Sequence, residues 1–322
     1  MGTGLSLGPA GFGGANLGNI FTAMSDEHAA AILEAAWDAG VRYFDTAPHY
    51  GLGLAERRLG AFLRTRPRAE YVVSTKAGRL LVPSPETSDK FDDEGQFAVP
   101  ADMRRVWDFT AGGVRRSLEE SLERLGLDAV DVLFLHDPDE HTGQPLATSV
   151  GQGVPAAVAL REEGLVRAVG IGSKSTEALV MGVRTGPVDM MMVAGRYTLL
   201  EQPAAAELIP ECRERGVEIV VAGPFNSGLL STPNPGAGAR YEYGDAPAAM
   251  VARAQRLAVI CAEHGVDLPV AALRFPLREP VVRAVVLGAT EPVHVRENVA
   301  RLAVPVPDAL WTHLAAEGLI PA

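Results

Sequence analysis

The chain has 322 residues, of which 47% are hydrophobic and 21% are charged, and its net charge is −11. This composition is typical of a folded protein with a large apolar core. The negative charge disfavours binding to a nucleic-acid backbone or to an anionic membrane. No apolar run approaches the roughly 18 residues of a membrane span. We therefore expect neither a nucleic acid nor a membrane as partner.

The two cysteines, Cys212 and Cys261, have neither the spacing of a metal site nor the density of a disulfide scaffold. The N-terminus lacks the basic start and apolar core of a signal peptide. It matches the loose myristoylation pattern with Gly2 and Ser6, but short patterns of this kind recur by chance. We predict a cytoplasmic protein, and the sequence leaves its oligomeric state open.

Apolar segments typical of strands alternate with amphipathic segments typical of helices along the chain. The expected strands lie around Leu5 and Leu7 and at 41–45, 71–75, 130–136, 167–172, 188–193, 217–222 and 282–287. The expected helices run from the capping residue Ser25 to Gly40 and over 54–64, 111–125, 155–163, 175–184, 203–215 and 247–264. Eight such units without a flexible linker predict one domain over 1–322, an α/β protein with a closed (β/α)8 TIM barrel.

Two segments are too long for the short connections of such a barrel. Residues 77–109 are polar and rich in Pro and Asp, and loops of this length are usually lids or disordered insertions. Residues 231–246 are also irregular. Both segments follow strands, so we expect both to overhang the catalytic face, the second one closing over a cofactor.

Four polar residues lie at or just after predicted strand ends, where barrel enzymes keep their chemistry. They are Asp45, Tyr50, Lys76 and His136. A tyrosine hydroxyl, with a pKa of about 10, exchanges protons poorly at neutral pH unless a neighbour stabilises its phenolate. A lysine can do this when an aspartate holds it, and a histidine can orient a substrate oxygen. Taken singly, each residue has a structural interpretation, as a turn former, a loop plug, a surface lysine or a core histidine.

The stretch FDTAPHYG resembles the signature of the aldo-keto reductases, and further landmarks of that family follow in order. They are VVSTK, VDVLFLHDPD, VRAVGIGS, GPFNSGLL and LGATEPVHVREN. The resemblance covers nearly the whole chain. It implies that Asp45, Tyr50, Lys76 and His136 form the family's catalytic tetrad, and that hydride is exchanged with a nicotinamide dinucleotide lying across the barrel mouth.

The same resemblance implies a set of cofactor-binding residues. They are Gly13, Gly14, Ser173, Lys174, Pro224, Phe225, Asn226, Ser227, Gly228, Leu229, Gly288, Thr290, His294 and Asn298. The chain departs from the common pattern at Lys174, Ala194 and Ala222, where the family usually has Asn, Gln and an aromatic residue. Thr290 stands where many NADP-using members have Arg, and Glu291 would repel a 2′-phosphate. We therefore predict NAD as the preferred cofactor, with NADP possible.

Within the family the chain looks most similar to the dehydrogenases that oxidise C1 of aldoses of the L-fucose, L-galactose or D-threo-aldose type to lactones. Pyridoxal 4-dehydrogenases are closely related, and a general aldehyde reductase is a further alternative. The resemblance therefore implies a small-molecule substrate, an aldose or an aldehyde. The expected pocket residues are His49, Trp107, Arg196 and Tyr197.

Three other interpretations compete with this one. The run HDPDEH, from His136 to His141, contains metal-binding residue types, but Pro138 interrupts it and no further ligands are evident, so we predict no metal. Lys76 could form the Schiff base of an aldolase, although Tyr50 would then have no role. The altered nicotinamide contacts leave open a regulatory subunit that binds cofactor and turns over slowly.

Overall fold

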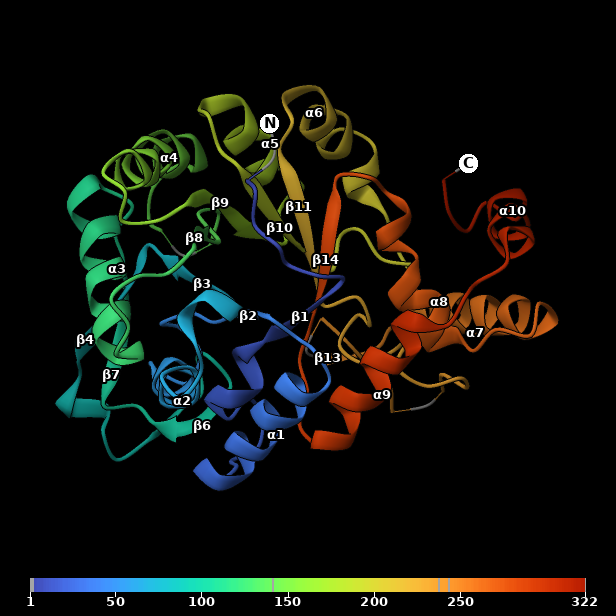
Figure 1. The fold of residues 1–322 in the computed structure, drawn as a ribbon, viewed down its shortest axis with the longest axis horizontal. Coiled ribbons are helices and arrows are strands. Elements are labelled where there is room, and N and C mark those ends of the chain that lie inside the picture. The colour runs from blue at the N-terminus through green and yellow to red at the C-terminus, as the bar shows by residue number, and fades with distance from the viewer. Residues whose placement is uncertain (1–2, 141, 237, 243, 322) are drawn as a thin grey trace.

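The computed structural model describes residues 3–140, 142–236, 238–242 and 244–321. Its centre is a closed barrel of eight parallel strands surrounded by helices (Figure 1), so the predicted (β/α)8 barrel is confirmed. In chain order the barrel strands are β1 (Ala10–Gly13), β2 (Tyr43–Asp45), β3 (Val72–Ala77), β8 (Val132–His136), β9 (Ala168–Ser173), β10 (Met190–Ala194), β11 (Glu218–Ala222) and β14 (Val282–Leu287).

The helices agree with the predicted pattern, with local differences. They are α1 (Asp26–Asp38), α2 (Leu54–Leu63), α3 (Ala111–Leu125), α4 (Leu146–Glu162), α5 (Thr176–Thr185), α6 (Leu208–Arg215), α7 (Ala248–Glu263), α8 (Leu268–Arg274), α9 (Pro292–Ala303) and α10 (Asp308–Ala316). Short 3-10 turns are η1 (Gly14–Gly18), η2 (Arg68–Glu70), η3 (Pro85–Thr87), η4 (Pro203–Ala205) and η5 (Pro276–Arg278). The predicted start of α1 is confirmed, because Ser25 Oγ accepts a hydrogen bond from the His28 amide at 3.2 Å.

Three helix predictions were wrong or incomplete. Helix α4 begins at Leu146 and not near 155. Proline is common in the first turn of a helix, but Pro155 lies inside this one. The predicted helix 203–215 is divided into η4 and α6. The sequence pattern does not predict α8 or α10. Nearly every residue of α8 is buried, so the helix has no polar face to reveal its period.

Alternate side chains of the barrel strands belong to two separate apolar clusters. Those that point into the barrel include Tyr43, Phe134, Met192 and Val286. Their neighbours along the strands, such as Phe44, contact the surrounding helices in the larger outer cluster. Because both faces of each strand are buried, the strands appear in the sequence as continuous apolar runs.

The first strand lies a few residues later than predicted. Leu5 and Leu7 are not in a strand, although both are buried in the cluster inside the barrel. Thr3 Oγ1 donates a hydrogen bond to Glu218 Oε2 at 2.6 Å, so this segment lies at the amino ends of the strands. Two alternating leucines that plug an opening have the same sequence pattern as a strand, which explains the error.

Residues 79–107, which we call the insert, form two hairpins. Strand β4 (Arg79–Pro83) pairs with β7 (Met103–Trp107), and β5 (Phe91–Asp92) pairs with β6 (Phe97–Pro100). A small apolar cluster joins the insert, through Leu81 and Phe97, to Leu52 in the loop that carries Tyr50. Of the two usual forms of so long a segment, a lid or a disordered insertion, the second is wrong here, because the insert is ordered and lies beside the Tyr50 loop.

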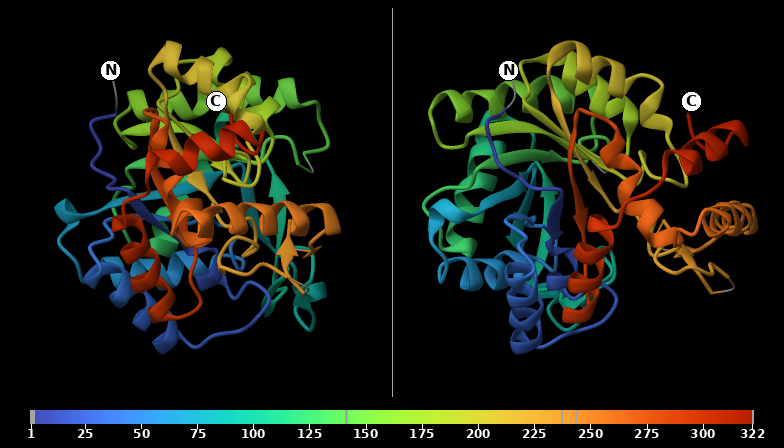
Figure 2. Two further views of the ribbon diagram at one scale, coloured as in Figure 1. Left: turned by 90° about the vertical axis from the view of Figure 1, so that its right-hand side faces the viewer. Right: turned by 45° about the vertical axis from the view of Figure 1, so that its right-hand side comes forward.

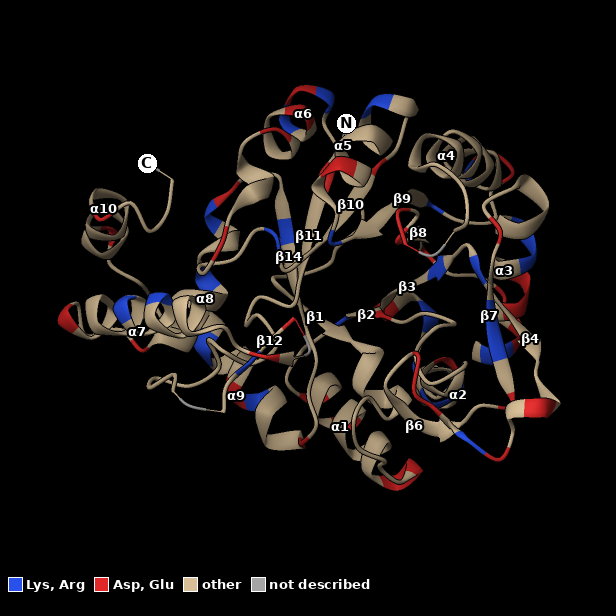
Figure 3. Cartoon of the chain, turned by 180° about the vertical axis from the view of Figure 1, so that it is seen from behind, with Lys and Arg blue, Asp and Glu red and all other residues tan. Residues whose placement is uncertain are grey.

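Residues 231–246, which we call the strap, carry β12 (Arg240–Tyr241) and β13 (Gly244–Asp245) in their described part. The strap lies beside α7, where Gln255 Nε2 donates to the Pro235 carbonyl at 3.0 Å (Figure 2). Acidic and basic residues are mixed over the outer helices (Figure 3). None of the described helices has both the length and the apolar character needed to cross a membrane.

Candidate active site

Three of the four predicted catalytic side chains form one hydrogen-bonded group at the carboxyl ends of β2 and β3. Lys76 Nζ donates to Asp45 Oδ2 at 2.6 Å, to the Thr46 carbonyl at 2.9 Å and to the Tyr50 hydroxyl at 3.1 Å. Lys76 and Asp45 are each only 2% exposed, whereas Tyr50 is half-buried. The ammonium is thus held between a carboxylate inside the barrel and a phenol at its mouth.

The group extends inward through a residue that the sequence analysis missed. Ser74 Oγ donates to Asp45 Oδ1 at 2.7 Å, and the Tyr43 hydroxyl lies 3.0 Å from Ser74 Oγ. Both carboxylate oxygens of Asp45 therefore have partners. The signal was available, because Ser74 precedes Lys76 by two residues and side chains at that spacing share one face of a strand.

Electrostatics keep Lys76 charged. Burial alone would lower the pKa of Lys76, but attraction to Asp45 and Tyr50 outweighs it, and the pKa lies above its usual value. The Lys76 ammonium also lies 4.7 Å from the centroid of the Tyr50 ring. A permanent cation beside the hydroxyl stabilises the phenolate, so the arrangement can hold and return a proton at Tyr50.

His136, the last residue of β8, is 6% exposed, and its ring centroid lies 5.8 Å from that of Tyr50. Burial, together with the cations Arg79 and Lys76, lowers its pKa well below the usual range. The imidazole is therefore neutral and carries one N–H. Its Nε2 lies 3.4 Å from Asp137 Oδ2, and Nδ1 has no hydrogen-bond partner among the described residues. A neutral donor beside Tyr50 suits the orientation of a substrate oxygen.

Two glycines hold the Tyr50 loop in place. Gly51 has φ of +61°, and a Cβ there would lie 2.3 Å from the Gly18 carbonyl oxygen. A Cβ on Gly18 would lie 2.6 Å from the Tyr50 carbonyl carbon. Only residues without side chains allow η1 and the Tyr50 loop to approach so closely. The backbone contact thus sets the position of the phenol.

The four predicted substrate residues have different surroundings. The His49 ring is 6.0 Å from Tyr50 and 5.6 Å from His136, so it joins the group at the mouth. Trp107 lies in β7 of the insert, opposite Arg79. The remaining two lie elsewhere, as described next.

Arg196 donates to Glu201 at 3.1 Å and to Glu242 of the strap at 2.8 Å. Tyr197 packs against Phe275, with ring centroids 5.3 Å apart, in the outer apolar cluster. Burial raises the pKa of Tyr197 to about 12. This packing gives no support to a substrate-binding role for Tyr197. Its side chain lies in the outer apolar cluster, against the helices.

The predicted cofactor-binding residues all follow the carboxyl ends of barrel strands, on the same face as Tyr50. Gly13 ends β1 and Gly14 begins η1, Ser173 ends β9, residues 224–229 follow β11, and residues 288–298 lead from β14 into α9. Ser173 Oγ donates to Asp139 Oδ1 at 2.8 Å, and Lys174 Nζ donates to Glu242 Oε2 at 2.8 Å. Lys174 thus links the barrel to the strap.

The backbone of this face fits a dinucleotide. In the turn after β11, Gly223, Asn226, Ser227 and Gly228 all have positive φ, a geometry that points amides toward anions. Asn226 Oδ1 is buried and has no partner among the described residues. No side chain caps the amino end of α9, but its first residue, Pro292, has no N–H, and the His294 amide donates to the Glu291 carbonyl at 3.1 Å. The turn after β11 therefore offers a phosphate more than the start of α9 does.

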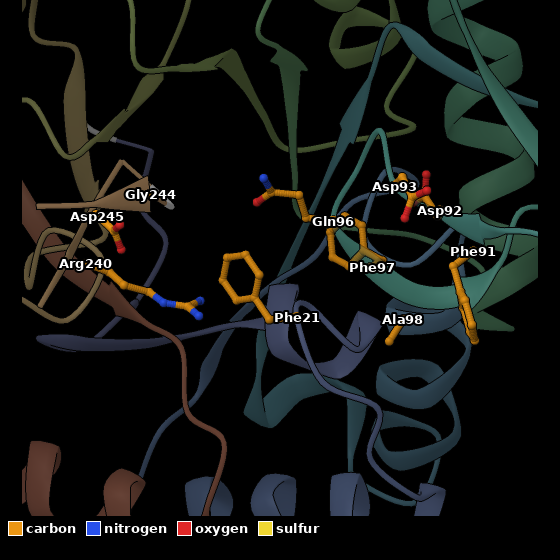
Figure 4. A pocket seen from close by; sticks show the side chains of 10 residues that line it. All are labelled: Phe21, Phe91, Asp92, Asp93, Gln96, Phe97, Ala98, Arg240, Gly244 and Asp245. Atoms are coloured by element: carbon orange, nitrogen blue, oxygen red, sulfur yellow. The ribbon is translucent and has the colours of Figure 1, made fainter. Parts of the chain in front are cut away.

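A cleft of about 540 Å³ lies between the insert and the strap (Figure 4). Its wall includes Phe21, Phe97 and Arg240, and the Arg240 guanidinium lies 4.7 Å from the centroid of the Phe21 ring. Phe97 also packs against His49 and Tyr50, at ring distances of 5.3 and 6.2 Å. The cleft therefore adjoins the group around Tyr50.

The acidic run after β8 has other partners. Asp137 pairs with Arg79, and Asp139 accepts from Ser173. Burial raises the pKa of Asp137 to about 6. His141 lies outside the described residues. Within the described ranges, no group of three or more His, Cys, Asp or Glu residues is arranged to hold a metal ion.

A sequence model of the Aldo/keto reductase family matches residues 9–316. The chain belongs to the aldo/keto reductase family. The resemblance that the motifs predicted is thus confirmed. As a member of this family the protein is an oxidoreductase that uses a nicotinamide dinucleotide.

Individual relatives agree with this assignment. This aldo-keto reductase is 53% identical to a D-threo-aldose 1-dehydrogenase from Pseudomonas sp, over 99% of this chain and 96% of the relative. It is 38% identical to a pyridoxal 4-dehydrogenase from Microbacterium luteolum, with the same coverage of 99% and 96%. A solved structure of a glycerol dehydrogenase from Gluconobacter oxydans has a TM-score of 0.75 at 21% identity, over 97% of this chain and 93% of that one, and shares the fold.

Proposed function

We propose that the enzyme oxidises the C1 hydroxyl of an aldose of the L-fucose, L-galactose or D-threo-aldose type to the lactone. The observation that carries the proposal is the position of Lys76 Nζ, 3.1 Å from the Tyr50 hydroxyl and 2.6 Å from Asp45. The relative at 53% identity, named as a D-threo-aldose 1-dehydrogenase, supports the choice of substrate.

We assign to Tyr50 the role of general base, which accepts the proton of the substrate hydroxyl. In the oxidative direction its phenolate accepts the proton of the C1 hydroxyl, and the hydrogen on C1 leaves as hydride, so that C1 loses two electrons and becomes the lactone carbonyl. The dinucleotide, when bound, supplies the hydride acceptor. Lys76 stabilises the phenolate before the transfer, and neutral His136 donates a hydrogen bond to the same substrate oxygen.

We further propose that NAD is preferred over NADP. Thr290 and Glu291 stand at the uncapped amino end of α9, where a 2′-phosphate would need a cation. A carboxylate at this point repels the phosphate dianion and leaves the 2′-hydroxyl of NAD unaffected. A higher specificity constant with NADP than with NAD would refute this preference.

A pyridoxal 4-dehydrogenase is the second candidate, because a relative of that name is 38% identical over 99% of the chain. Both reactions remove a hydride from an alcohol carbon and a proton from its oxygen, so the roles of Tyr50 and Lys76 are the same. The two candidates differ only in what the cleft must bind.

A substrate panel tests the proposal. Purified enzyme is incubated with L-fucose, L-galactose, D-arabinose or pyridoxal and with either dinucleotide, and absorbance of the reduced cofactor is followed. We expect turnover of at least one aldose with NAD, and little in the Tyr50→Phe variant. Activity confined to pyridoxal would select the second candidate. Tight cofactor binding without turnover of any panel member would indicate a regulatory subunit.

A further inference from the structure

His49, the residue before Tyr50, is anchored by an arginine of the insert. Arg105 Nε donates to His49 Nδ1 at 2.5 Å, and Arg105 Nη2 donates to the His49 carbonyl at 3.1 Å. A guanidinium has donors and no acceptor. Nδ1 of His49 must therefore be the acceptor, and the neutral ring carries its proton on Nε2.

Arg105 is itself held rigidly. Its two terminal nitrogens donate to both carboxylate oxygens of Asp92, at 2.7 and 2.6 Å. The side chains of Arg105 and Asp92 are only 2% and 4% exposed. A paired, planar and buried guanidinium cannot turn without leaving charges unpaired, so the insert sets the orientation of the His49 ring.

The His49 ring, which carries its proton on Nε2, lies among the rings of Tyr50, Phe97 and His136 at the barrel mouth. The ring is half-buried and packs edge-on against Phe97 and His136, with centroids 5.3 and 5.6 Å away. No described residue exchanges a hydrogen bond with Nε2. Burial and the cations Arg79 and Arg105 lower the pKa of His49 well below its usual range, which keeps the ring neutral. A fixed donor of known tautomer thus stands beside the phenol.

We propose that His49 determines substrate specificity by donating a hydrogen bond from Nε2 to the C2 hydroxyl of the aldose, with Arg105 and Asp92 as its positioning residues. The inference rests on the proposed aldose oxidation. Tyr50 and His136 meet at the C1 oxygen, so the hydroxyl on the adjacent ring carbon is the next group to reach the His49 ring, whose centroid is 6.0 Å from that of Tyr50.

The test compares an aldose with its 2-deoxy counterpart, for example L-fucose with 2-deoxy-L-fucose, in wild type and variants. The wild-type enzyme should prefer the hydroxylated sugar by about tenfold in kcat/KM, the effect of one hydrogen bond. His49→Phe keeps an aromatic ring against Phe97 and removes the hydrogen-bond donor. The ratio of kcat/KM for the two sugars should therefore fall toward one. His49→Gln retains an N–H near the Nε2 position and should keep part of it.

The positioning role has a matched pair of variants on β7. Arg105→Lys removes the fork that holds His49, whereas Arg104→Lys changes the exposed neighbour on the opposite side of the strand. Arg105→Lys should reduce the preference for the sugar with a 2-hydroxyl, and Arg104→Lys should leave it unchanged. Combining Arg105→Lys with His49→Phe should reduce the preference no further than His49→Phe alone, because both remove the same interaction.

The outcomes separate the two proposals. If the wild-type enzyme oxidises no aldose, the proposed function fails. If it oxidises L-fucose but His49→Phe, with unchanged NAD affinity and circular dichroism, keeps the wild-type preference, the role of His49 is refuted. Should His49→Phe not fold, an unchanged preference in His49→Gln and Arg105→Lys together would also refute it.

Discussion

The insert and the strap flank the same barrel mouth, but their charges are held differently. In the insert, the Arg105–Asp92 pair is almost completely buried. In the strap, Glu242 pairs with Lys174 and Arg196, and the side chains of these three residues are between 22% and 33% exposed. The insert contacts the Tyr50 side of the mouth, and the strap spans the loops after β9 and β10.

The difference in burial implies a difference in rigidity. Separating a buried pair leaves desolvated charges, which is strongly unfavourable, whereas exposed pairs contribute about 0–1 kcal/mol and weaken in salt. The insert side of the mouth is therefore held more rigidly, and the ion pairs of the strap cost less free energy to separate. Four predictions test this contrast, from the largest expected effect to the smallest.

The largest effect is expected at Lys76 of β3, inside the barrel mouth that the two regions flank. Lys76→Met leaves Asp45 as an unpaired buried carboxylate, so we expect a loss of about 3–5 kcal/mol in the free energy of unfolding. We also expect a fall in turnover of about 10²- to 10⁴-fold. Urea denaturation and steady-state kinetics measure the two. Tyr50→Phe is the control, since it should match the kinetic loss while the Lys76–Asp45 pair preserves stability.

The second prediction concerns the insert. Asp92→Asn leaves the Arg105 guanidinium buried without a countercharge, and we expect the free energy of unfolding to fall by about 3 kcal/mol. Urea denaturation measures it, with Asp93→Asn on the neighbouring exposed carboxylate as control. A loss below about 1 kcal/mol would show that the insert is no more firmly held than the strap.

The third prediction concerns pH. The lowered pKa of His49 means that below the ordinary histidine pKa of about 6.5 the unfolded chain takes up a proton that the folded protein does not. The contribution of neutral His49 to the stability of the fold is fully present above pH about 6.5 and is lost as the pH falls below that value. Melting temperatures measured from pH 5 to 7.5 should therefore fall less steeply on acidification in His49→Gln than in wild type. Parallel curves would contradict the neutral, buried state of the His49 ring.

The smallest effect is expected in the strap. Glu242→Gln should lower the free energy of unfolding by at most about 1 kcal/mol, because the lost ion pairs are partly solvated. It should also weaken cofactor binding a few-fold, and the difference from wild type should shrink when salt is raised from about 0.05 to 0.5 M. Fluorescence titration with NAD measures the affinity. A loss as large as that of Asp92→Asn would remove the contrast between the two regions.

The barrel and most of its catalytic face were predictable from local sequence. Strands buried on both faces appear as apolar runs, and polar residues at their carboxyl ends, such as Asp45 and His136, mark one edge of the sheet. The motif order then assigned the family. These features depend on short-range periodicity and on the direction of the chain, both of which the sequence displays directly.

Only the tertiary structure decided which polar residues lie in contact. The hydrogen bonds from Arg105 to His49 join residues 56 positions apart, and no local pattern marks Arg105 as buried and its neighbour Arg104 as exposed. The placement of Leu5 and Leu7 inside the barrel, and of Tyr197 against the helices, also depends on long-range packing. The free energy of such contacts comes from desolvation and pairing between distant segments, so it is set only when the barrel closes.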